Sequence, residues 1–368
     1  MSITYSPCYQ TLHIMHKDKF NNKFIEFMNA NYPDDHSKHV YIFSSGDENF
    51  PPIKTPNTFE IPFIYDTKAE VYSKLLQLMN TSDLIILHGL FNQVIVKLLF
   101  ENQDILKKCI WIIWGGDLYY FKHRDQNDEA SNSYEELRRD IISKFFGIAA
   151  GIYGDYSIAK EIYGFSGKHY NFAYPLIAKR PTGLIGVDKK DRDTITFLLG
   201  NSADPTNNHE DVLRTLTKFK DNNIQVIIPL SYGNKVHANK ISELAHNLLG
   251  RKVRILREYI DPEEYNKLLS SVDIAIFNHD RQQAVNSIIA LLSLGKKVYL
   301  RSNVTTWDYL ISNFNVKLHD SLDLPKLSYQ DLLSGIDENS NSGKMRVIYE
   351  DNYYKSLYDP IFCKNQST

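Results

Sequence analysis

Ile195-Thr-Phe-Leu-Leu-Gly-Asn-Ser-Ala-Asp-Pro-Thr-Asn-Asn-His209 is the stretch of sequence that decides the fold. Five residues that suit a buried strand are followed by Gly200, a polar loop and the amphipathic segment 210–219. A strand, a tight loop and a helix in this order are typical of an α/β protein, whose ligands bind beyond the carboxyl ends of parallel strands. Backbone N–H groups and side chains of Gly200, Asn201 and Ser202 are therefore candidates to bind a diphosphate. The same residues also fit a plain polar turn.

The alternation of short apolar runs with amphipathic segments continues on both sides of this stretch. Helices are expected between the strands, at 68–79, 92–100, 134–146, 155–163, 210–219, 236–249, 262–270 and 282–294. Further strands are expected at 40–43, 84–87, 110–113, 148–153, 225–229, 253–256, 273–277 and 297–300.

A charged, Pro- and Gly-containing segment separates the two halves. It predicts an N-terminal Rossmann-like domain at 1–180, a linker at 181–192 and a C-terminal Rossmann-like domain at 193–345. Residues 346–368 form a tail with a final helix that is expected to pack back on the first domain. We expect the two open sheets to face each other across a cleft.

The composition excludes several classes of protein. A net charge of -2 offers no basic excess for nucleic-acid binding. Cys8, Cys109 and Cys363 are too few and too far apart for a disulfide framework or a zinc site, which indicates a reducing, cytoplasmic compartment. The N-terminus shows no signal-peptide pattern, and no apolar run approaches the roughly 20 residues of a membrane span, so any membrane role is expected to be peripheral.

Two further loops of the second half carry ligand-binding side chains. Arg281, Gln282 and Gln283 follow the strand at 273–277 and are expected on the first turn of a helix. The helix dipole disfavours a cation there, so the arginine suggests a bound anion, and the alternative is that it simply points to water. Tyr232 lies in another strand-to-helix turn, where it could stack on a base or sugar or simply pack.

In the first half, two strand ends suggest acid–base chemistry. His88 ends the strand at 84–87 and could act as a base, or be a structural histidine bonded to backbone. Asp117 follows two glycines after the strand at 110–113 and is expected to project into the cleft as a general base for an acceptor hydroxyl. The alternative is that Asp117 caps the following helix. Trp114 and Tyr119 flank it as sugar-stacking surfaces.

The segment 134–146 is amphipathic and carries Arg138, Arg139 and Lys144 beside apolar residues. This pattern occurs in helices that lie on anionic lipid, and also in surface helices packed on their own domain. Both interpretations remain open from the sequence.

Five stretches in this order resemble a known family. They are His88-Gly-Leu-Phe-Asn92, Trp111-Ile-Ile-Trp-Gly-Gly-Asp-Leu-Tyr119, Leu199-Gly-Asn-Ser-Ala-Asp204 with Asn208-His209, Val226-Ile-Ile-Pro-Leu-Ser-Tyr-Gly233, and Arg281-Gln-Gln283. The chain is similar, from about residue 84 to about 310, to the bacterial family that transfers 4-acetamido-4,6-dideoxygalactose (Fuc4NAc) from a TDP-sugar to a lipid-linked intermediate of enterobacterial common antigen. These enzymes are of the 4-alpha-L-fucosyltransferase type.

The resemblance implies a GT-B glycosyltransferase of the hexosyltransferase class. The donor nucleotide then binds the C-terminal domain, through Gly200, Asn201, Ser202, Tyr232 and the Arg-Gln-Gln segment. The acceptor, a polyprenyl-diphosphate-linked glycan, binds the N-terminal domain at the cytoplasmic face of the inner membrane, with Asn92, Trp114, Gly116 and Tyr119 as its binding residues. Such enzymes generally hold the diphosphate without a metal or other cofactor, which agrees with the lack of a DxD motif in a plausible donor loop.

One departure bears on the donor sugar. The family carries glycines after Arg-Gln-Gln, whereas this chain has Ala284-Val-Asn286. The larger residues narrow the room beside the phosphate or sugar, so the donor could differ from Fuc4NAc and the product could belong to an O-antigen or a capsule. Other classes are a transferase with another nucleotide sugar and a non-catalytic nucleotide-sugar-binding protein. A sugar-nucleotide epimerase is disfavoured, because no GxGxxG follows an early strand.

Overall fold

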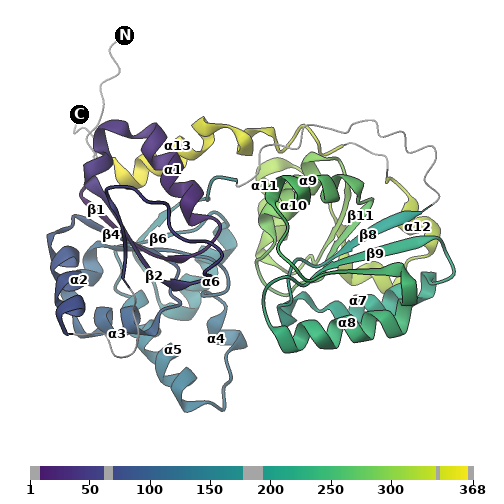
Figure 1. Ribbon diagram of the computed structural model, residues 1–368, viewed down its shortest axis with the longest axis horizontal. Helices are drawn as coiled ribbons and strands as arrows, with labels where there is room; N and C mark the ends of the chain where they lie inside the picture. The colour runs from purple at the N-terminus through teal and green to yellow at the C-terminus, as the bar shows by residue number, and fades with distance from the viewer. Residues whose placement is uncertain (1–8, 62–68, 177–193, 337–339, 364–368) are drawn as a thin grey trace, which may run out of the picture. The chain divides into compact units, whose positions relative to one another are not determined.

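The computed structural model describes residues 9–61, 69–176, 194–336 and 340–363, which form two units (Figure 1). Unit 1 extends to Ile177 and takes up the chain again from Glu350, while unit 2 comprises Ala178–Tyr349. The predicted linker, 181–192, lies outside the described residues.

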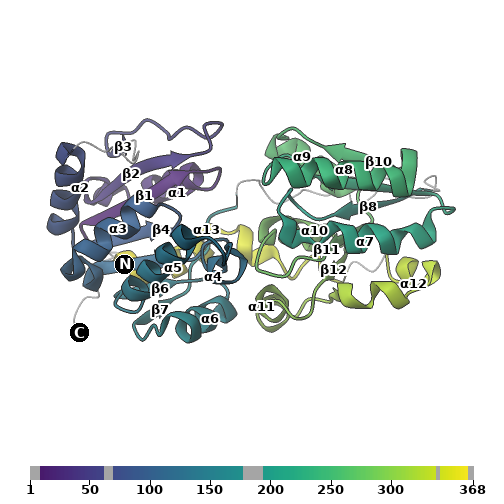
Figure 2. The ribbon, with the colours of Figure 1, turned by 90° about the horizontal axis from the view of Figure 1, so that it is seen from below.

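Unit 1 is built on a sheet of seven parallel strands in the order β3-β2-β1-β4-β5-β6-β7 (Figure 2). The strands are β1 (Thr11–Lys17), β2 (His39–Gly46), β3 (Thr58–Glu60), β4 (Leu84–His88), β5 (Cys109–Ile112), β6 (Gly147–Ala149) and β7 (Lys168–Tyr170). The helices are α1 (Asn21–Asn31), α2 (Ala69–Thr81), α3 (Gln93–Glu101), α4 (Tyr120–His123), α5 (Glu129–Ile142), α6 (Tyr153–Tyr163) and α13 (Asp351–Phe362).

Alternate residues of each strand of unit 1 enter two separate cores, because successive side chains of a strand point to opposite faces of the sheet. On one face Leu12 and Ile14 pack with helices α2, α3, α5 and α6. On the other face Met15 packs with α1 and α13. Helix α13 is fastened there by the Tyr358 hydroxyl, which donates to the Ala173 carbonyl at 2.8 Å. The last helix of the chain therefore completes the core of the first unit (Figure 1).

Unit 2 has a sheet of six parallel strands in the order β10-β9-β8-β11-β12-β13. The strands are β8 (Ile195–Leu199), β9 (Ile224–Pro229), β10 (Val253–Leu256), β11 (Ile274–Phe277), β12 (Lys297–Leu300) and β13 (His319–Asp320). The helices are α7 (His209–Leu216), α8 (Lys235–Leu249), α9 (Pro262–Ser271), α10 (Val285–Ser293), α11 (Thr305–Phe314) and α12 (Tyr329–Leu333). Helices α7 and α8 cover one face, and α9, α10 and α11 lie on the other (Figure 1).

In each sheet the strand order reverses at one point. In unit 1 the reversal lies between β1 and β4, and in unit 2 between β8 and β11. Loops that leave neighbouring strands in opposite directions open a crevice at such a point, which is where ligands of open parallel sheets bind. The loops after β1, β4, β8 and β11 are therefore where a functional site should be sought.

Most of the predicted elements are present, but the sequence prediction missed the central strand of unit 1. Strand β1 carries His13, His16 and Lys17 within seven residues and is almost entirely buried. A strand buried on both faces normally reads as a continuous apolar run. The histidines interrupt that run, so its periodicity did not identify it as a strand. The short strands β3, β7 and β13 and the helices α1, α4, α11 and α12 were missed as well.

Candidate active site

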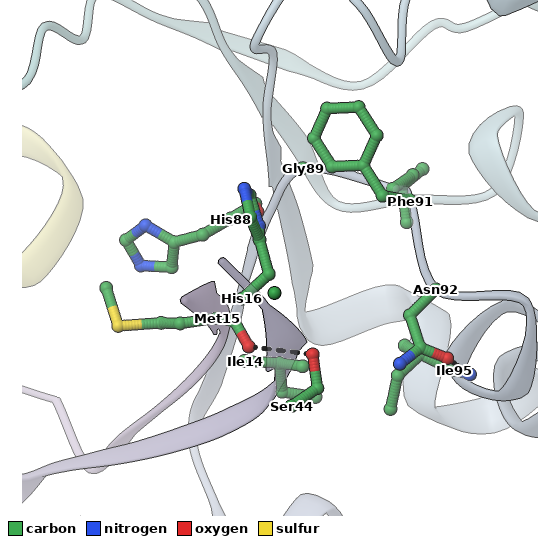
Figure 3. A pocket seen from close by; sticks show the side chains of 11 residues that line it. Ile14, Met15, His16, Ser44, His88, Gly89, Phe91, Asn92 and Ile95 are labelled. Carbon is green, nitrogen blue, oxygen red and sulfur yellow. Dashed lines mark hydrogen bonds between the residues drawn. The ribbon is translucent and has the colours of Figure 1, made fainter. Parts of the chain in front are cut away.

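A pocket of about 220 Å³ lies at the strand reversal of unit 1. Its walls come from the ends of β1, β2 and β4 and from the start of α3. Figure 3 shows His16, Ser44, Phe91 and Asn92 around this space. The residues that line it include no lysine, arginine or carboxylate, so the pocket suits a neutral ligand group.

His16 is the one lining residue of this pocket that has both a titratable side chain and a ring nitrogen without a hydrogen-bond partner among the described residues. Its Nδ1 lies 3.1 Å from the His88 carbonyl oxygen. A carbonyl can only accept, so Nδ1 carries the proton and the lone pair is on Nε2. Burial lowers the pKa of His16, and Asp18 and Asp117 oppose that shift. His16 is thus a neutral imidazole with two carboxylates nearby to stabilise the imidazolium, as a general base requires.

His88, the histidine that the sequence suggested as a base, is 1% exposed and belongs to a buried hydrogen-bonded chain. The indole N–H of Trp114 donates to the Tyr174 hydroxyl at 2.9 Å, and that hydroxyl is hydrogen-bonded to His88 Nδ1, 2.5 Å away. His88 Nε2 shares a hydrogen bond with His13 Nδ1 at 3.0 Å, and His13 Nε2 shares another with His39 Nδ1 at 3.0 Å. Both nitrogens of His88 are engaged, which favours the structural role that the sequence also left open over a role as the base.

Asp117 does not project into an open space, as the sequence analysis expected, but is 1% exposed. Its Oδ1 accepts from the backbone N–H groups of Trp114 and Leu118, each at 2.9 Å. Its Oδ2 accepts from the Leu90 N–H at 3.0 Å and the Trp111 indole at 2.6 Å. Four donors occupy the carboxylate, which ties the loop after β4 to the loop after β5. The prediction that it faces an acceptor hydroxyl is wrong, because these bonds turn it inward.

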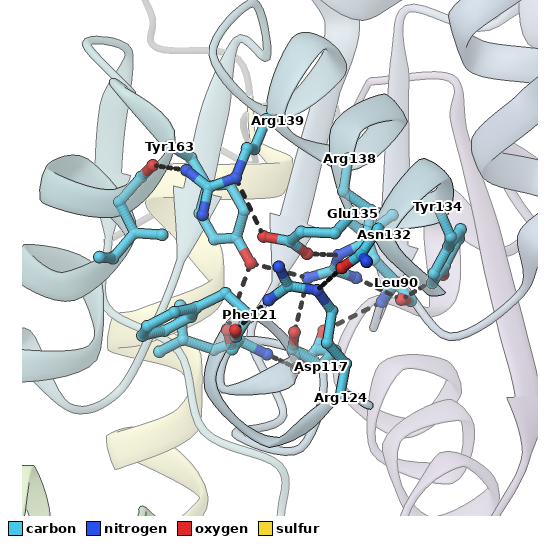
Figure 4. A network of polar contacts seen from close by, with 12 residues as sticks. Leu90, Asp117, Phe121, Arg124, Asn132, Tyr134, Glu135, Arg138, Arg139 and Tyr163 are labelled. Atoms are coloured by element: carbon cyan, nitrogen blue, oxygen red, sulfur yellow. Dashed lines mark hydrogen bonds and ion pairs between the residues drawn. The ribbon is translucent and has the colours of Figure 1, made fainter. Parts of the chain in front are cut away.

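Arg138 also connects the loop after β4 with the loop after β5 (Figure 4). It is fully buried, and its guanidinium donates to the Leu90 carbonyl at 2.6 Å and to the Asp117 carbonyl at 2.5 Å. Glu135 balances its charge at 3.2 Å. Aromatic rings surround the cation, namely those of Trp111, Tyr120, Tyr134 and Tyr163. A buried, compensated guanidinium of this kind fixes the loops and cannot touch lipid.

The other cations of the segment 134–146 are also engaged. Arg139 pairs with Glu135 and donates to the Ile162 carbonyl at 2.7 Å, and Lys144 pairs with Asp140 at 2.8 Å. Arg138 faces the core, so it cannot contact lipid as the lipid-surface interpretation requires. Arg139 and Lys144 form ion pairs with carboxylates of the same helix region.

The aromatic residue that lines this pocket differs from the two that the sequence predicted. Tyr119 is 7% exposed, so it offers no stacking surface. The rings of His16, Phe91 and Tyr174 pack around Trp114. Phe91, which the sequence analysis passed over, is 45% exposed and lines the pocket.

Two further predicted acceptor residues have definite positions. Asn92 lines the pocket and caps α3, its Oδ1 accepting from the N–H groups of Val94 and Ile95 at 2.9 and 3.3 Å. Its Nδ2 is therefore the group left to donate to a ligand. Gly116 lies against the Phe91 ring, since a Cβ at this position would be 3.5 Å from the ring.

In unit 2, most of the backbone N–H groups predicted to bind a diphosphate donate to other atoms of the protein. Gly200 N–H donates to the Ile276 carbonyl at 2.9 Å, and Asn201 N–H donates to Asn207 Oδ1 at 3.2 Å. Only the Ser202 N–H of these three has no partner among the described residues. Gly200, with φ of 69°, has to be glycine because a Cβ would lie 2.7 Å from His209 Nε2. The expectation that all three amides are available to a ligand is wrong, since two of them hold the loop together.

The Asn201 side chain connects this loop with the next one. Its Nδ2 donates to the Tyr232 hydroxyl at 2.8 Å, while its Oδ1 is buried without a partner among the described residues. Tyr232 remains 46% exposed, so one part of the ring is still accessible to a ligand.

Arg281, Gln282 and Gln283 lie in a loop and not on the first turn of a helix. Helix α10 begins only at Val285, because Ala284 adopts a left-handed backbone with φ of 59°. The dipole argument for an anion beside Arg281 therefore loses its premise. The guanidinium pairs with Asp204 at 2.7 Å across the strand reversal, and Gln283 Nε2 donates to Thr206 Oγ1 at 3.2 Å.

Several polar groups near this reversal are buried without partners among the described residues. They include Gln282 Oε1, Thr306 Oγ1 and both ring nitrogens of His279. Burial, together with the nearby charges of Arg281 and Arg301, lowers the pKa of His279 to about 3. Arg301 follows β12 directly and has no carboxylate partner within the described part of the chain. It is thus an uncompensated cation at the edge where a diphosphate was predicted, and the sequence analysis missed it.

The strained Ala284 allows a test of local stability. A left-handed backbone costs a residue with a Cβ about 1–2 kcal/mol, whereas glycine adopts it freely. Ala284→Gly is therefore expected to raise the free energy of unfolding by about 0.5–1 kcal/mol in chemical denaturation, after the entropy cost of glycine is deducted. Ala290→Gly, inside the same helix, should instead lower it by about 1 kcal/mol. Equal losses in both variants would contradict the strain.

Among the described residues, none of the helices has an apolar stretch of the length that a membrane span needs, and His, Cys, Asp and Glu side chains do not gather in threes or more where they could bind a metal ion.

Comparisons with known proteins agree with this architecture. A family model described as 4-alpha-L-fucosyltransferase, glycosyl transferase group 56, matches residues 11–352. Alr3699/HepE of Anabaena, in complex with UDP and glucose, is similar at a TM-score of 0.66 and 10% identity, over 95% of this chain and 99% of that chain. A glycosyltransferase of Rickettsia africae ESF-5 is similar at a TM-score of 0.65 and 15% identity, over 95% and 98%. These structures confirm the predicted GT-B-like fold.

Proposed function

The chain belongs to the 4-alpha-L-fucosyltransferase family, glycosyl transferase group 56, and from this premise we propose that it moves a deoxy-amino sugar from a TDP-sugar to a polyprenyl-diphosphate-linked glycan. The sugar is Fuc4NAc or a close relative. As a member of this family the chain is a glycosyltransferase with a nucleotide-sugar donor. The product belongs to a surface polysaccharide, either enterobacterial common antigen or an O-antigen. A lipid-held acceptor brings the enzyme to the cytoplasmic face of the inner membrane.

His16 acts as the general base in this proposal, and its geometry is the observation that carries it. The Nε2 lone pair takes the proton of the acceptor hydroxyl while that oxygen bonds to the anomeric carbon of the donor. The bond from that carbon to the diphosphate breaks, and the diphosphate leaves with the bonding electrons. The Nδ1–H bond to the His88 carbonyl keeps the imidazole in the tautomer that this step needs.

The leaving diphosphate binds at the strand reversal of unit 2. The Ser202 N–H, Arg281 and Arg301 are the donors, and Gln282 and Gln283 complete the loop beside them. Gly200 and Asn201 shape this loop, and Tyr232 contacts the nucleoside or the sugar. Charge developing on the diphosphate is stabilised by these oriented donors, so no divalent ion is required.

A donor screen tests the proposed function. Purified protein is mixed with TDP, UDP, GDP and NAD, and its melting temperature is followed, because a ligand that binds only the folded form raises it. We expect the largest rise with TDP. Sugar transfer from TDP-Fuc4NAc to a lipid-linked glycan, followed by mass spectrometry, should proceed in EDTA at the same rate as with magnesium. A rise with NAD alone, or transfer that requires magnesium, would contradict the proposal.

A further inference from the structure

Phe91 stands out among the residues that line the pocket of unit 1. Its neighbour Leu90 is 2% exposed, whereas Phe91 is 45% exposed. An aromatic side chain that lies half in solvent forgoes part of its hydrophobic stabilisation. Together with its place in the pocket wall, this exposure suggests that the ring serves a ligand.

The backbone on both sides of Phe91 is held firmly. The N–H of Leu90 donates to the Asp117 carboxylate at 3.0 Å, and its carbonyl accepts from Arg138 at 2.6 Å and from the Tyr134 hydroxyl at 3.0 Å (Figure 4). On the other side, Asn92 caps α3. A buried carboxylate and a buried guanidinium therefore both serve the turn that presents this one exposed ring.

The ring itself has a defined orientation. It lies against the backbone of Gly89, where a Cβ would come within 2.6 Å of it, and beside Gly116. Its centroid is 5.1 Å from that of His16 at an interplanar angle of 74°, and 6.5 Å from that of Trp114 at 87°. Phe91 is thus perpendicular to the base and borders the same pocket, as Figure 3 shows.

We propose that Phe91 is the stacking platform for the terminal pyranose ring of the acceptor glycan. One face of a pyranose carries C–H groups, which pack on an aromatic ring, and its hydroxyls lie at the edge. With this face on Phe91, an edge hydroxyl meets His16 Nε2, and Asn92 Nδ2 donates to a neighbouring oxygen. The pocket lining has no cation, so a sugar ring suits it better than a phosphate. This inference rests on the proposed function.

Three variants test the platform. Phe91→Ala should raise the acceptor KM about tenfold and lower kcat, because the hydroxyl is no longer held against the base. Phe91→Tyr keeps the ring and should stay within about twofold of wild type. Phe100→Ala is the matched control: Phe100 lies on α3, is 39% exposed and does not line the pocket, so its KM should not change. Affinity for TDP, measured by calorimetry, should be the same in all four proteins.

The outcomes separate the platform from the proposed function. If the wild type transfers sugar and Phe91→Ala has the same acceptor KM as the wild type, the stacking platform is overturned while the proposed function stands. Absence of transfer by the wild type overturns the proposed function. Saturation-transfer NMR with a soluble form of the glycan then tests the platform directly: binding that Phe91→Ala abolishes supports it, and binding that is equal in both proteins, or absent from the wild type, contradicts it.

Discussion

Replacement of His16 by glutamine is expected to lower the kcat of sugar transfer by about two to four orders of magnitude, the usual contribution of a positioned general base. Glutamine keeps a polar side chain beside the His88 carbonyl but has no nitrogen lone pair that can take a proton. The acceptor KM and the affinity for TDP should change little, since neither depends on proton transfer. In the wild type, kcat should hold down to about pH 6.5, because burial lowers the pKa of His16.

Asp117→Asn provides the contrast that identifies the base. Two donors reach each oxygen of Asp117, and asparagine offers only one oxygen to accept them. Each buried group left unsatisfied costs about 1–3 kcal/mol. Asp117→Asn should therefore lose both activity and stability. His16→Gln should lose activity, while the denaturant concentration at its unfolding midpoint stays close to that of the wild type. A fully active His16→Gln enzyme would remove the proposed base.

The second large effect is a steep loss of stability in acid. Burial lowers the pKa of His13 and His88 in unit 1 well below the usual value, and lowers the pKa of His209 and His279 in unit 2 to about 3. Below about pH 6.5 the unfolded chain binds protons that the folded chain does not, so stability falls as pH falls. Each histidine contributes about 1.4 kcal/mol per pH unit. The two histidines of each unit should therefore lower its free energy of unfolding by about 4 kcal/mol in all between pH 7.5 and 5, with most of the loss below pH 6.5, measured by urea denaturation.

A matched pair of substitutions isolates one of these histidines. His209 is fully buried, and neither ring nitrogen has a partner among the described residues, so His209→Leu removes the titration without the loss of a hydrogen bond. The acid dependence of unit 2 should become shallower by about 1.4 kcal/mol per pH unit. His246→Gln, at an exposed position of α8, should leave the dependence unchanged. Equal stability of the wild type at pH 7.5 and pH 5 would contradict the prediction.

Five of the six strands of unit 2 could be predicted to within about one residue, while the short strand β13 was missed. Strands β8, β10 and β12 begin and end where the sequence analysis placed them. Each is a short apolar run between turn residues, and a parallel strand covered on both faces needs little else. The loops after these strands followed from the same rule, so the candidate diphosphate site was found in the correct part of the fold. The start of α10 was misplaced, because nothing in the sequence indicates that Ala284 adopts a left-handed backbone.

The candidate site of unit 1 could not be predicted in this way. Strand β1 was not recognised, so His16 never entered the set of candidate bases, although histidine at a strand end was already accepted as a signal at His88. Asp117 and Tyr119 were assigned to the open site from their neighbours in sequence, and burial reversed both assignments. Local pattern cannot show which of several polar residues at one sheet edge faces inward.

The sequence by itself determined the α/β architecture, the two halves and the sheet edges where ligands bind, because these depend on local apolar periodicity and on turn residues. Only the tertiary structure brought His16 forward as the proposed base. The proton of His16 is placed by the carbonyl of His88, 72 residues away, and the two ring nitrogens of His88 are occupied by Tyr174 and His13. A tautomer is set by hydrogen-bond partners in space, and those partners meet only when β1, β4 and the end of β7 come together in one fold.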